Sequence, residues 1–478
     1  MKGWLLLGTQ IVWFRRDLRI HDNKALYYAL EHLKEDDKLL LLYHIHPDLT
    51  DALTKRHDYY YEALYDHVQK IEQQGGSLHF ITGSVEDAFQ SLFSIVDDCT
   101  AIHVNVDDTP FARERDQFVQ QLADKQNIHY HDYTDAHLHG AQEIVKKDHS
   151  HYQVFTPYYK QWINRTKERP YHIDLSQLRD VIQKRTDDFT EGQKRYGTLM
   201  QKKTGKWKQM AGSDRAFEQL QAFITNGLLT SYNSDRDRPD FDGTSRLSAY
   251  LRTGAISPRT VYAAVQEYVD ESGNDEGANI FIQELAWRDF YNMIYYHYPT
   301  SKDEEIISKY QQLQWSYDEE RYHHWKNGTT GFPIVDAAMR QLNEIGWMHN
   351  RLRMIVASFT KDLQLDWRLG ERYFQDHLID YDPASNIGGW QWAASTGTDA
   401  VPYFRIFNPT RQSERFDPDG TFITSYLPEL KEVPLAYIHE PSKMSDSEQE
   451  DAHCVIGSDY PEPIVSHQEM RQKNPRTL

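Results

Sequence analysis

The sequence predicts two joined parts: an α/β domain with a doubly wound, five-stranded parallel sheet, followed by an all-α domain. Three observations support this fold class. The first third of the chain alternates apolar runs with helical patterns, almost every pattern after residue 216 is helical, and 478 residues are too many for one compact core. The expected boundaries are residues 1–138 for the α/β domain, 139–212 for a long linker and 213–478 for the helical domain.

Five short apolar runs in the α/β part are typical of buried strands. The strands are expected at Ile11–Phe14, Leu39–Tyr43, Leu78–Ile81, Ala101–Val106 and Ile128–Tyr130, with helices between them at Asn23–Leu33, Asp58–Gln74, Val85–Val96 and Ala112–Lys125. The first strand leads into Arg15, Arg16 and Asp17 rather than into a glycine-rich loop. A dinucleotide bound on a Rossmann fingerprint is therefore not expected.

The middle of the chain loses periodicity from about His139 to Gly212, which indicates a connection over the surface. The later segments have apolar residues at three- and four-residue spacing, typical of packed helices. These helices are expected at Ala216–Asn226, Leu247–Thr253, Pro258–Val269, Ile280–His297, Pro333–Glu344, Asn350–Asp362 and Glu371–Leu378.

Composition limits the compartment and the partners. The net charge of −19 argues against nucleic acid as a partner, and acidic runs such as Asp303–Glu305 contribute to this charge. Residues 340–415 nevertheless carry equal numbers of acidic and basic residues. A local site for a polyanion is therefore not excluded. No apolar run approaches the roughly 20 residues of a membrane span, and none makes a signal peptide. Two cysteines, Cys99 and Cys454, form no disulfide framework, so we expect a cytoplasmic protein.

Histidines gather around the start of the expected linker without forming a recognisable metal motif. They lie at positions 129, 131, 137, 139, 149 and 151. No Cys/His or His/carboxylate spacing among them closes a tetrahedral set. The sequence therefore predicts no metal site.

The stretch from Asp380 to Pro409 concentrates aromatic and polar residues. Trp390 and Trp392 follow a Gly-Gly pair, and Asp380, Asp382 and Asn386 precede them. Buried polar groups need partners, which are either protein groups in a packed core turn or a bound ligand. Composition alone leaves both interpretations open.

Three shorter patterns allow a functional and a structural interpretation. Residues 242–248, DGTSRLS, form a turn before a helix start, which is either a phosphate site or ordinary capping by Thr244 or Ser245. Glu284, Trp287 and Arg288 share a helix face, which is either a floor for a base and a phosphate or an ion pair beside a core tryptophan. Residues 350–354, NRLRM, place two arginines either at a phosphate backbone or on a solvated face.

Together and in this order, these motifs resemble the photolyase/cryptochrome flavoprotein family. The resemblance covers nearly the whole chain and is most similar to class I cyclobutane pyrimidine dimer photolyases. It rests on VWFRRDLRIHDN at 12–23, VFTPYYKQW at 154–162, DGTSRLSAYLRTGAISPR at 242–259, ELAWRDFY at 284–291, GFPIVDAAMRQLNEIGWMHNRLRM at 331–354 and GGWQWAASTGTDAVPYFRIFNP at 388–409.

The resemblance implies an FAD, active as FADH⁻, in the helical domain. It implies that the diphosphate is held by Thr244, Ser245, Leu247 and Ser248, with Tyr232 nearby as a further cofactor-binding residue. It also implies that Asp380 and Asp382 meet the rest of the cofactor and that Asn386 faces flavin N5. Trp390, Trp367 and Trp315 match the family's chain of tryptophans that re-reduces oxidised flavin.

The implied activity is light-driven repair of cyclobutane pyrimidine dimers in DNA, with the lesion flipped out of the duplex. Excited FADH⁻ would give an electron to the dimer, the two bonds joining the pyrimidines would split, and the electron would return. Glu284 and Asn350 would bind the base edges, while Trp287, Trp392 and Met354 would line the pocket. The residues expected at phosphates are Arg236, Arg288, Arg351, Arg353 and Arg405.

Two parts of the resemblance leave alternatives. The folate-binding members have an asparagine and a glutamate where this chain has Phe111 and Ala112, although His44 is suitably placed. The second chromophore is therefore methenyltetrahydrofolate, a deazaflavin, a flavin, or absent. The alternative activity is that of a cryptochrome-type blue-light photoreceptor. We expect a monomer without an obligate protein partner or membrane contact, associated with the nucleoid when bound to damaged DNA.

Overall fold

The chain forms two compact units, and the computed structural model describes residues 8–50, 53–273, 275–399 and 407–466. Unit 1 comprises residues 1–152, 156–230 and 245–296, and unit 2 comprises residues 153–155, 231–244 and 297–478. The helices within residues 213–230 and 245–296 belong to the same compact unit as the sheet, and not to the unit that contains the later helices. The compact units thus divide the chain differently from the predicted domain boundaries.

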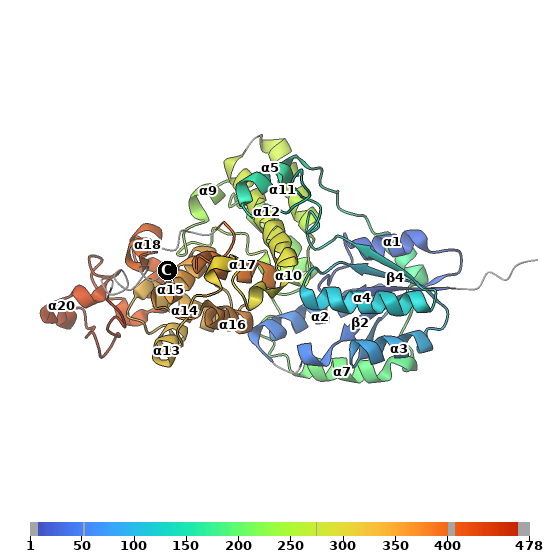
Figure 1. Ribbon diagram of the computed structural model, residues 1–478, viewed down its shortest axis with the longest axis horizontal. Coiled ribbons are helices and arrows are strands. Elements are labelled where there is room, and N and C mark those ends of the chain that lie inside the picture. The colour runs from blue at the N-terminus through green and yellow to red at the C-terminus, as the bar shows by residue number, and fades with distance from the viewer. Residues whose placement is uncertain (1–7, 51–52, 274, 400–406, 467–478) are drawn as a thin grey trace, which may run out of the picture. The chain divides into compact units, whose positions relative to one another are not determined.

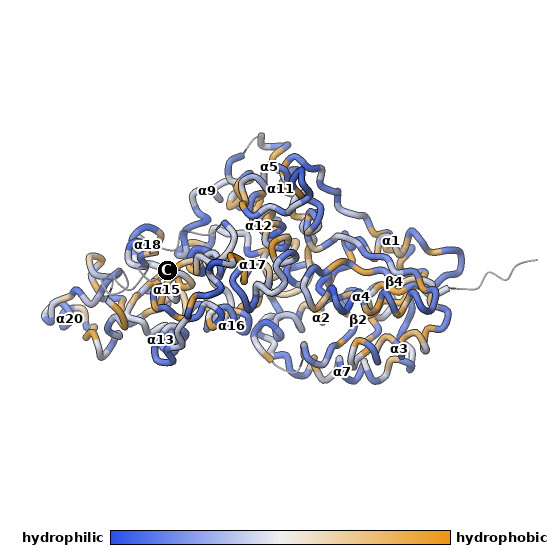
Figure 2. Tube along the Cα trace, viewed as in Figure 1, coloured by the Kyte–Doolittle hydropathy of each residue, from blue (hydrophilic) through white to orange (hydrophobic). Residues whose placement is uncertain are grey.

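A five-stranded parallel sheet is the centre of unit 1 (Figure 1). Its order, β3-β2-β1-β4-β5, puts the fully buried β1 in the middle and β5 at one edge. Figure 2 shows apolar residues at β2 and β4 and more hydrophilic residues in the surrounding helices. The strands are β1 Thr9–Phe14, β2 Lys38–Ile45, β3 Leu78–Thr82, β4 Cys99–Asn105 and β5 His129–Tyr133. All five overlap the predicted runs, which confirms the α/β prediction.

Helices of unit 1 connect and flank these strands. They are α1 Lys24–His32, α2 Lys55–Gln73, α3 Val85–Ile95, α4 Pro110–Lys125, α5 Phe155–Asn164, α6 Leu175–Val181, α7 Thr190–Gln201, α8 Ser213–Thr225, α10 Ser248–Thr253, α11 Pro258–Ser272 and α12 Glu276–His297, of which Phe155 and His297 fall in unit 2. Three of them, α5, α6 and α7, lie in the region expected to be a linker. Helix α7 packs on β3, so part of that region covers the sheet.

A buried ionic cluster joins the segment after β1 to α11. The Arg259 guanidinium lies 2.6 Å from Asp135 and 3.0 Å from Asp22, and Arg19 also pairs with Asp135. All four side chains are almost completely buried. Burying an unpaired charge is costly, so removing any one of these four residues would leave an uncompensated charge in the interior. The intact cluster therefore fixes the position of α11.

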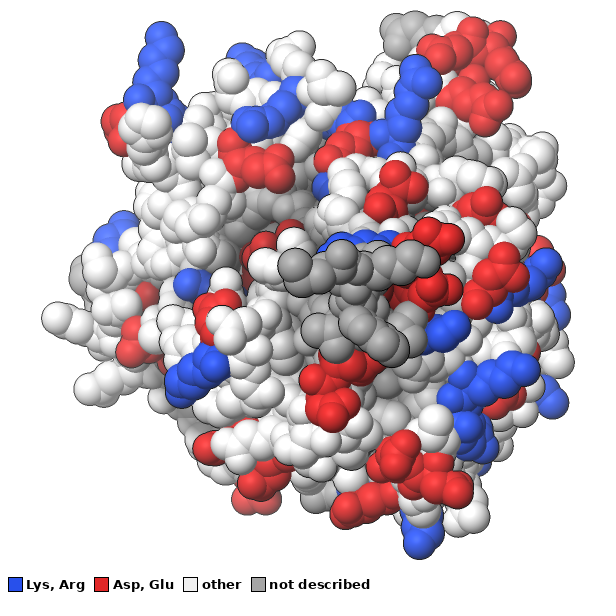
Figure 3. Space-filling view, turned by 90° about the vertical axis from the view of Figure 1, so that its right-hand side faces the viewer, with Lys and Arg blue, Asp and Glu red and all other residues white. Residues whose placement is uncertain are grey.

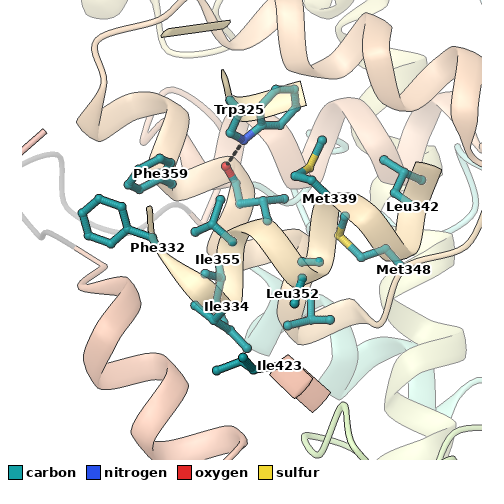
Figure 4. Packing of buried hydrophobic residues seen from close by; sticks show 14 of the residues in the cluster. Trp325, Phe332, Ile334, Met339, Leu342, Met348, Leu352, Ile355, Phe359 and Ile423 are labelled. Atoms are coloured by element: carbon teal, nitrogen blue, oxygen red, sulfur yellow. Dashed lines mark hydrogen bonds between the residues drawn. The ribbon is translucent and has the colours of Figure 1, made fainter. Parts of the chain in front are cut away.

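Unit 2 is helical around its own apolar core. Its helices are α9 Tyr232–Asp235, α13 Glu319–Asn327, α14 Pro333–Ile345, α15 Asn350–Asp362, α16 Trp367–His377, α17 Pro383–Ala393, α18 Pro409–Phe416, α19 Thr421–Tyr426 and α20 Asp446–Asp451. Trp325 lies in this core and donates its indole N–H to the Val356 carbonyl at 3.1 Å, beside Met339 and Ile355 (Figure 4). The prediction of a helical part after the sheet is confirmed.

Candidate functional site

The start of α17 holds two of the predicted cofactor carboxylates. Asp382 caps the helix by accepting the Ser385 backbone N–H at 3.1 Å. Asp380 is only 6% exposed, and its carboxylate accepts a hydrogen bond from Arg353 at 2.8 Å. The backbone carbonyl of Met348 also accepts from the Arg353 guanidinium at 2.8 Å, which orients that group. The result is a charge-balanced carboxylate–guanidinium pair between α15 and the approach to α17.

Arg353 was predicted to meet a DNA phosphate. In unit 2 the Arg353 guanidinium forms an ion pair with the Asp380 carboxylate, so Arg353 has a protein partner inside the candidate site. The phosphate contact itself stays a prediction. Arg405, another predicted phosphate ligand, lies outside the described residues.

Asn386 is oriented by a buried glutamate from α16. Its amide N–H group donates to Glu371 Oε1 at 3.1 Å, and the Tyr381 hydroxyl donates to the same oxygen at 2.8 Å. Burial raises the pKa of the Glu371 carboxyl, while these two hydrogen bonds oppose the rise. Since the nitrogen of Asn386 is the donor, its side-chain oxygen points elsewhere as an acceptor.

Trp390 and Trp392 have different environments, as expected of helical positions about 200° apart. Trp390 is 2% exposed and packs edge-on against Phe374, with ring centroids 5.1 Å apart. Its indole N–H has no hydrogen-bond partner among the described residues. Trp392 is only partly buried and packs at the margin of the same core.

Two further tryptophans of unit 2 meet at one carboxylate. Trp315 and Trp367 both donate their indole N–H groups to Glu305 Oε1, at 2.8 Å and 3.3 Å. Arg368 donates to the same oxygen at 2.9 Å, and its guanidinium lies 4.8 Å from the Trp367 ring centroid. The structure therefore links two of the three predicted electron-transfer tryptophans through one acidic residue.

Sequence reasoning missed Glu305 and Glu371. In the sequence Glu305 is only part of an acidic run, whereas in the structure it is 4% exposed. Its partners lie ten and 62 positions further along the chain. No local spacing connects a carboxylate to indoles at such separations, and only the tertiary fold identifies the pair.

In unit 1, α12 presents the predicted pocket residues Glu284, Trp287 and Arg288. All three are partly buried, as expected for neighbours at i, i+3 and i+4. The Trp287 ring stacks on Tyr291 with centroids 5.6 Å apart. Arg288 donates to the Ala136 carbonyl, so it is held against the segment that follows β5. This face of α12 is therefore an aromatic surface, formed by Trp287, with an acidic group and a cationic group at its border.

In unit 2, the N-terminus of α15 carries the other predicted DNA-binding residues. Asn350 is exposed, and Arg351 pairs with Asp237 at 2.7 Å. The Met354 sulfur lies 3.7 Å from the Arg351 guanidinium. The cationic group of Arg236 lies 5.7 Å from the centroid of the Tyr232 ring, at α9. Two cationic groups, an amide and a thioether are thus grouped on one part of unit 2.

The predicted diphosphate segment precedes α10. This helix begins at Ser248 with Leu247 at its N-cap, and the Ser245 hydroxyl accepts the Leu247 N–H at 3.4 Å. In unit 2, the Thr244 hydroxyl oxygen is buried without a hydrogen-bond partner among the described residues. A buried hydroxyl without a protein partner fits a site that receives a polar ligand.

The surface shows no strong bias toward one sign on the side drawn in Figure 3, where acidic and basic side chains are interspersed. Within the described ranges, no helix combines the length and the apolar character needed to span a membrane.

Comparisons with known proteins agree with this arrangement. A family model described as DNA photolyase matches residues 10–174, and one described as the FAD binding domain of DNA photolyase matches residues 281–478. A deoxyribodipyrimidine photo-lyase of Alkalihalophilus pseudofirmus is 46% identical over 98% of this chain and 97% of its own. A class III photolyase from Agrobacterium tumefaciens superposes with a TM-score of 0.88, at 31% identity over 99% of this chain and 98% of its own. A cryptochrome from Synechocystis gives a TM-score of 0.82 at 25% identity, over 98% of each chain.

The fold and the matched regions define an FAD-binding protein in which a helical part follows a parallel α/β sheet. The chain belongs to the DNA photolyase family.

Proposed function

We propose that this protein repairs cyclobutane pyrimidine dimers in DNA with light, using reduced FAD. The observation that carries the proposal is the 46% identity to a deoxyribodipyrimidine photo-lyase over nearly the full length of both chains. The site residues support it, because polar groups that address a cofactor and tryptophans that could pass electrons occur together in unit 2. When bound, reduced FAD supplies the photoexcited electron that splits the dimer.

The described residues fit a flavin in two respects. The unpartnered Thr244 hydroxyl can donate to a phosphate oxygen. The Asn386 side-chain oxygen is free to accept a hydrogen bond because Glu371 takes its N–H. Reduced flavin carries a proton on N5, so an acceptor at this position favours the reduced form. Asp380 is already neutralised by Arg353, which limits the net charge beside an anionic flavin.

Electron supply to oxidised flavin is assigned to the tryptophans of unit 2. Trp390 lies in the core next to α16, Trp367 begins that helix, and Trp315 is partly exposed. Trp390 and Trp367 are both fully buried, so Trp315 is the member of the three that reaches the surface. Glu305 binds both outer indoles, so its carboxylate stabilises positive charge on either ring.

Damaged DNA is the proposed substrate. As the family resemblance implies, we assign the lesion contacts to Glu284, Trp287, Asn350, Met354 and Trp392. Arg236, Arg288 and Arg351 supply phosphate contacts, which explains how a chain of charge −19 binds a polyanion locally. Such binding should weaken steeply as the salt concentration rises.

The second chromophore is a separate part of the proposal. Phe111 is exposed and packs edge-on against His46, with ring centroids 5.3 Å apart, while Ala112 is buried. The His44 ring is engaged by the Gly83 carbonyl at 3.0 Å, and burial lowers its pKa to about 4. We infer that methenyltetrahydrofolate is not held here, because Ala112 cannot supply the carboxylate. A folate spectrum in the cofactors released by denaturation would contradict this.

The decisive experiment is repair of a dimer-containing oligonucleotide by the purified protein with chemically reduced flavin. We expect repair under near-UV or blue light and none in darkness. Absence of light-dependent repair would overturn the proposal. Binding to undamaged DNA or to a protein partner without repair would favour the photoreceptor function. The likeness to a cryptochrome structure keeps that function as the second candidate.

Light scattering on the same sample tests whether the protein is a monomer, as expected.

A further inference from the structure

Three histidines of unit 1 converge at the sheet edge, outside the candidate site described above. His32 lies in the last turn of α1, His103 in β4 and His131 in β5. One ring nitrogen from each lies within 4.8 Å of the others. The parallel register pairs His103 directly with His131, so both rings stand on one face of the sheet, and α1 brings His32 to that face.

The spacing of the three rings suits coordination to one ion. Their centroids are 4.8, 5.4 and 5.6 Å apart. Three imidazoles bound to a tetrahedral metal at about 2.0–2.1 Å from each nitrogen have their centroids about 5 Å apart. A modest rotation of the side chains would bring the nitrogens onto a common centre.

Buried Gln10 fixes the tautomer of His103. The Gln10 amide nitrogen donates to the His32 carbonyl at 2.9 Å, so its oxygen is the atom 2.8 Å from His103 Nε2. That nitrogen must therefore carry the proton, and the lone pair lies on Nδ1, 3.0 Å from the Tyr133 hydroxyl. A second residue that holds the N–H of a histidine and exposes its other nitrogen is typical of metal sites.

We propose that His32, His103 and His131 bind a late first-row divalent metal ion, with Zn²⁺ as the representative ligand. Imidazole nitrogen suits zinc, nickel and copper, whereas magnesium and calcium require oxygen ligands. The metal takes the lone pair on His103 Nδ1 in place of the Tyr133 hydroxyl, and solvent completes its coordination through the exposed side of His32. Binding would tie the end of α1 to β4 and β5.

The test uses the full-length protein, expressed without a histidine tag and stripped of metal by a chelator. Zn²⁺ is titrated by isothermal calorimetry, and Co²⁺ is added separately to record the d–d absorption of a nitrogen-ligated site. We expect one tight Zn²⁺ per chain and a higher Tm in its presence. His32→Ala and His131→Ala should each lower Zn²⁺ affinity at least tenfold and abolish the Tm shift. Both side chains are at least partly exposed, so these variants should fold.

His129→Ala is the matched control, because its ring lies beside His131 but outside the group of three. It should bind Zn²⁺ as the unchanged protein does. Gln10→Leu should weaken binding without removing a ligand. The proposal is overturned if no tight Zn²⁺ site is found, if His32→Ala and His131→Ala bind normally, or if His129→Ala loses binding to the same extent. Those results would leave the cluster as a set of packed rings without a metal.

Discussion

Trp315 and Trp367 donate their indole N–H groups to the same carboxylate oxygen of Glu305, at 2.8 Å and 3.3 Å. An oxidised indole is positively charged, so a buried carboxylate at hydrogen-bond distance stabilises the charge-separated state that precedes flavin reduction. Arg368 completes the arrangement by neutralising Glu305 in the resting protein. The pair therefore predicts that photoreduction depends on a residue outside the tryptophan chain.

Glu305→Gln should slow photoreduction of oxidised flavin by about tenfold or more, because a charge-assisted hydrogen bond of about 1.5–3 kcal/mol is lost. Transient absorption of the tryptophan radicals and steady photoreduction with an external reductant measure the effect. Repair by chemically reduced protein should be unchanged. Glu304→Gln, which alters the exposed neighbouring side chain, is the control. Equal photoreduction rates in both variants would remove Glu305 from the electron path.

Trp390→Phe and Trp287→Ala should separate electron supply from substrate binding. The Trp390 indole N–H has no partner among the described residues, so phenylalanine loses ring volume and redox activity but no hydrogen bond. This variant should photoreduce slowly and repair normally once reduced. Trp287→Ala should photoreduce normally but bind the lesion less tightly, by about 1–3 kcal/mol for a lost stacking contact. Similar repair defects from fully reduced flavin would contradict this division of roles.

Much of the fold could be predicted because its signals are local. The apolar runs that become β1 to β5 and the three- and four-residue spacing of α14 and α15 depend on neighbouring residues alone. The helices α5, α6 and α7 could not be predicted so well, because α7 is stabilised by packing on β3 rather than by a strong pattern of its own.

The site residues divide in the same way. Asp380, Asn386 and Trp390 belong to one contiguous motif, so a resemblance between sequences could identify them. Glu305 and the histidine cluster combine residues tens of positions apart, such as His32, His103 and His131. Sequence spacing predicted no metal site, because His32 and His103 lie far along the chain from the histidines between residues 129 and 151. His103 and His131 become neighbours through the register between β4 and β5, which local sequence patterns do not reveal.

Gly370→Ala should be destabilising although it replaces a glycine within a helix. Alanine normally stabilises a helix interior by about 1 kcal/mol relative to glycine. Here an added Cβ would lie 2.0 Å from the Trp390 ring, closer than atoms can approach. The ring must move, so we expect a lower Tm together with slower photoreduction. Gly389→Ala in α17 is the control, since a Cβ there meets no atom within 4 Å. A Tm equal to or above that of the unchanged protein would show that the ring shifts without cost.

Arg259→Ala should strongly destabilise unit 1. The substitution leaves Asp22 with no guanidinium partner from α11 and Asp135 with Arg19 alone. Breaking a buried ion pair from one side costs about 3–5 kcal/mol. Arg185→Ala, which removes an exposed pair with Glu72, should cost less than about 1 kcal/mol. Urea unfolding followed by circular dichroism measures both, and equal losses would mean that the cluster contributes no more than a surface pair.

The same cluster predicts how stability changes in acid. Burial by itself would raise the pKa of Asp135, but Arg19 and Arg259 outweigh it and lower the value from 3.8 to about 2. A carboxyl with a depressed pKa stabilises the folded state fully above its unfolded value and loses that contribution as the pH falls from about 3.8 through 2. The amount is on the order of 2 kcal/mol. In Arg259→Met the pKa of Asp135 should rise, so this part of the acid dependence should shrink. Unfolding midpoints of the two proteins should differ most near pH 5 to 7 and converge toward pH 2. A constant difference across this range would mean that Asp135 does not titrate in response to Arg259.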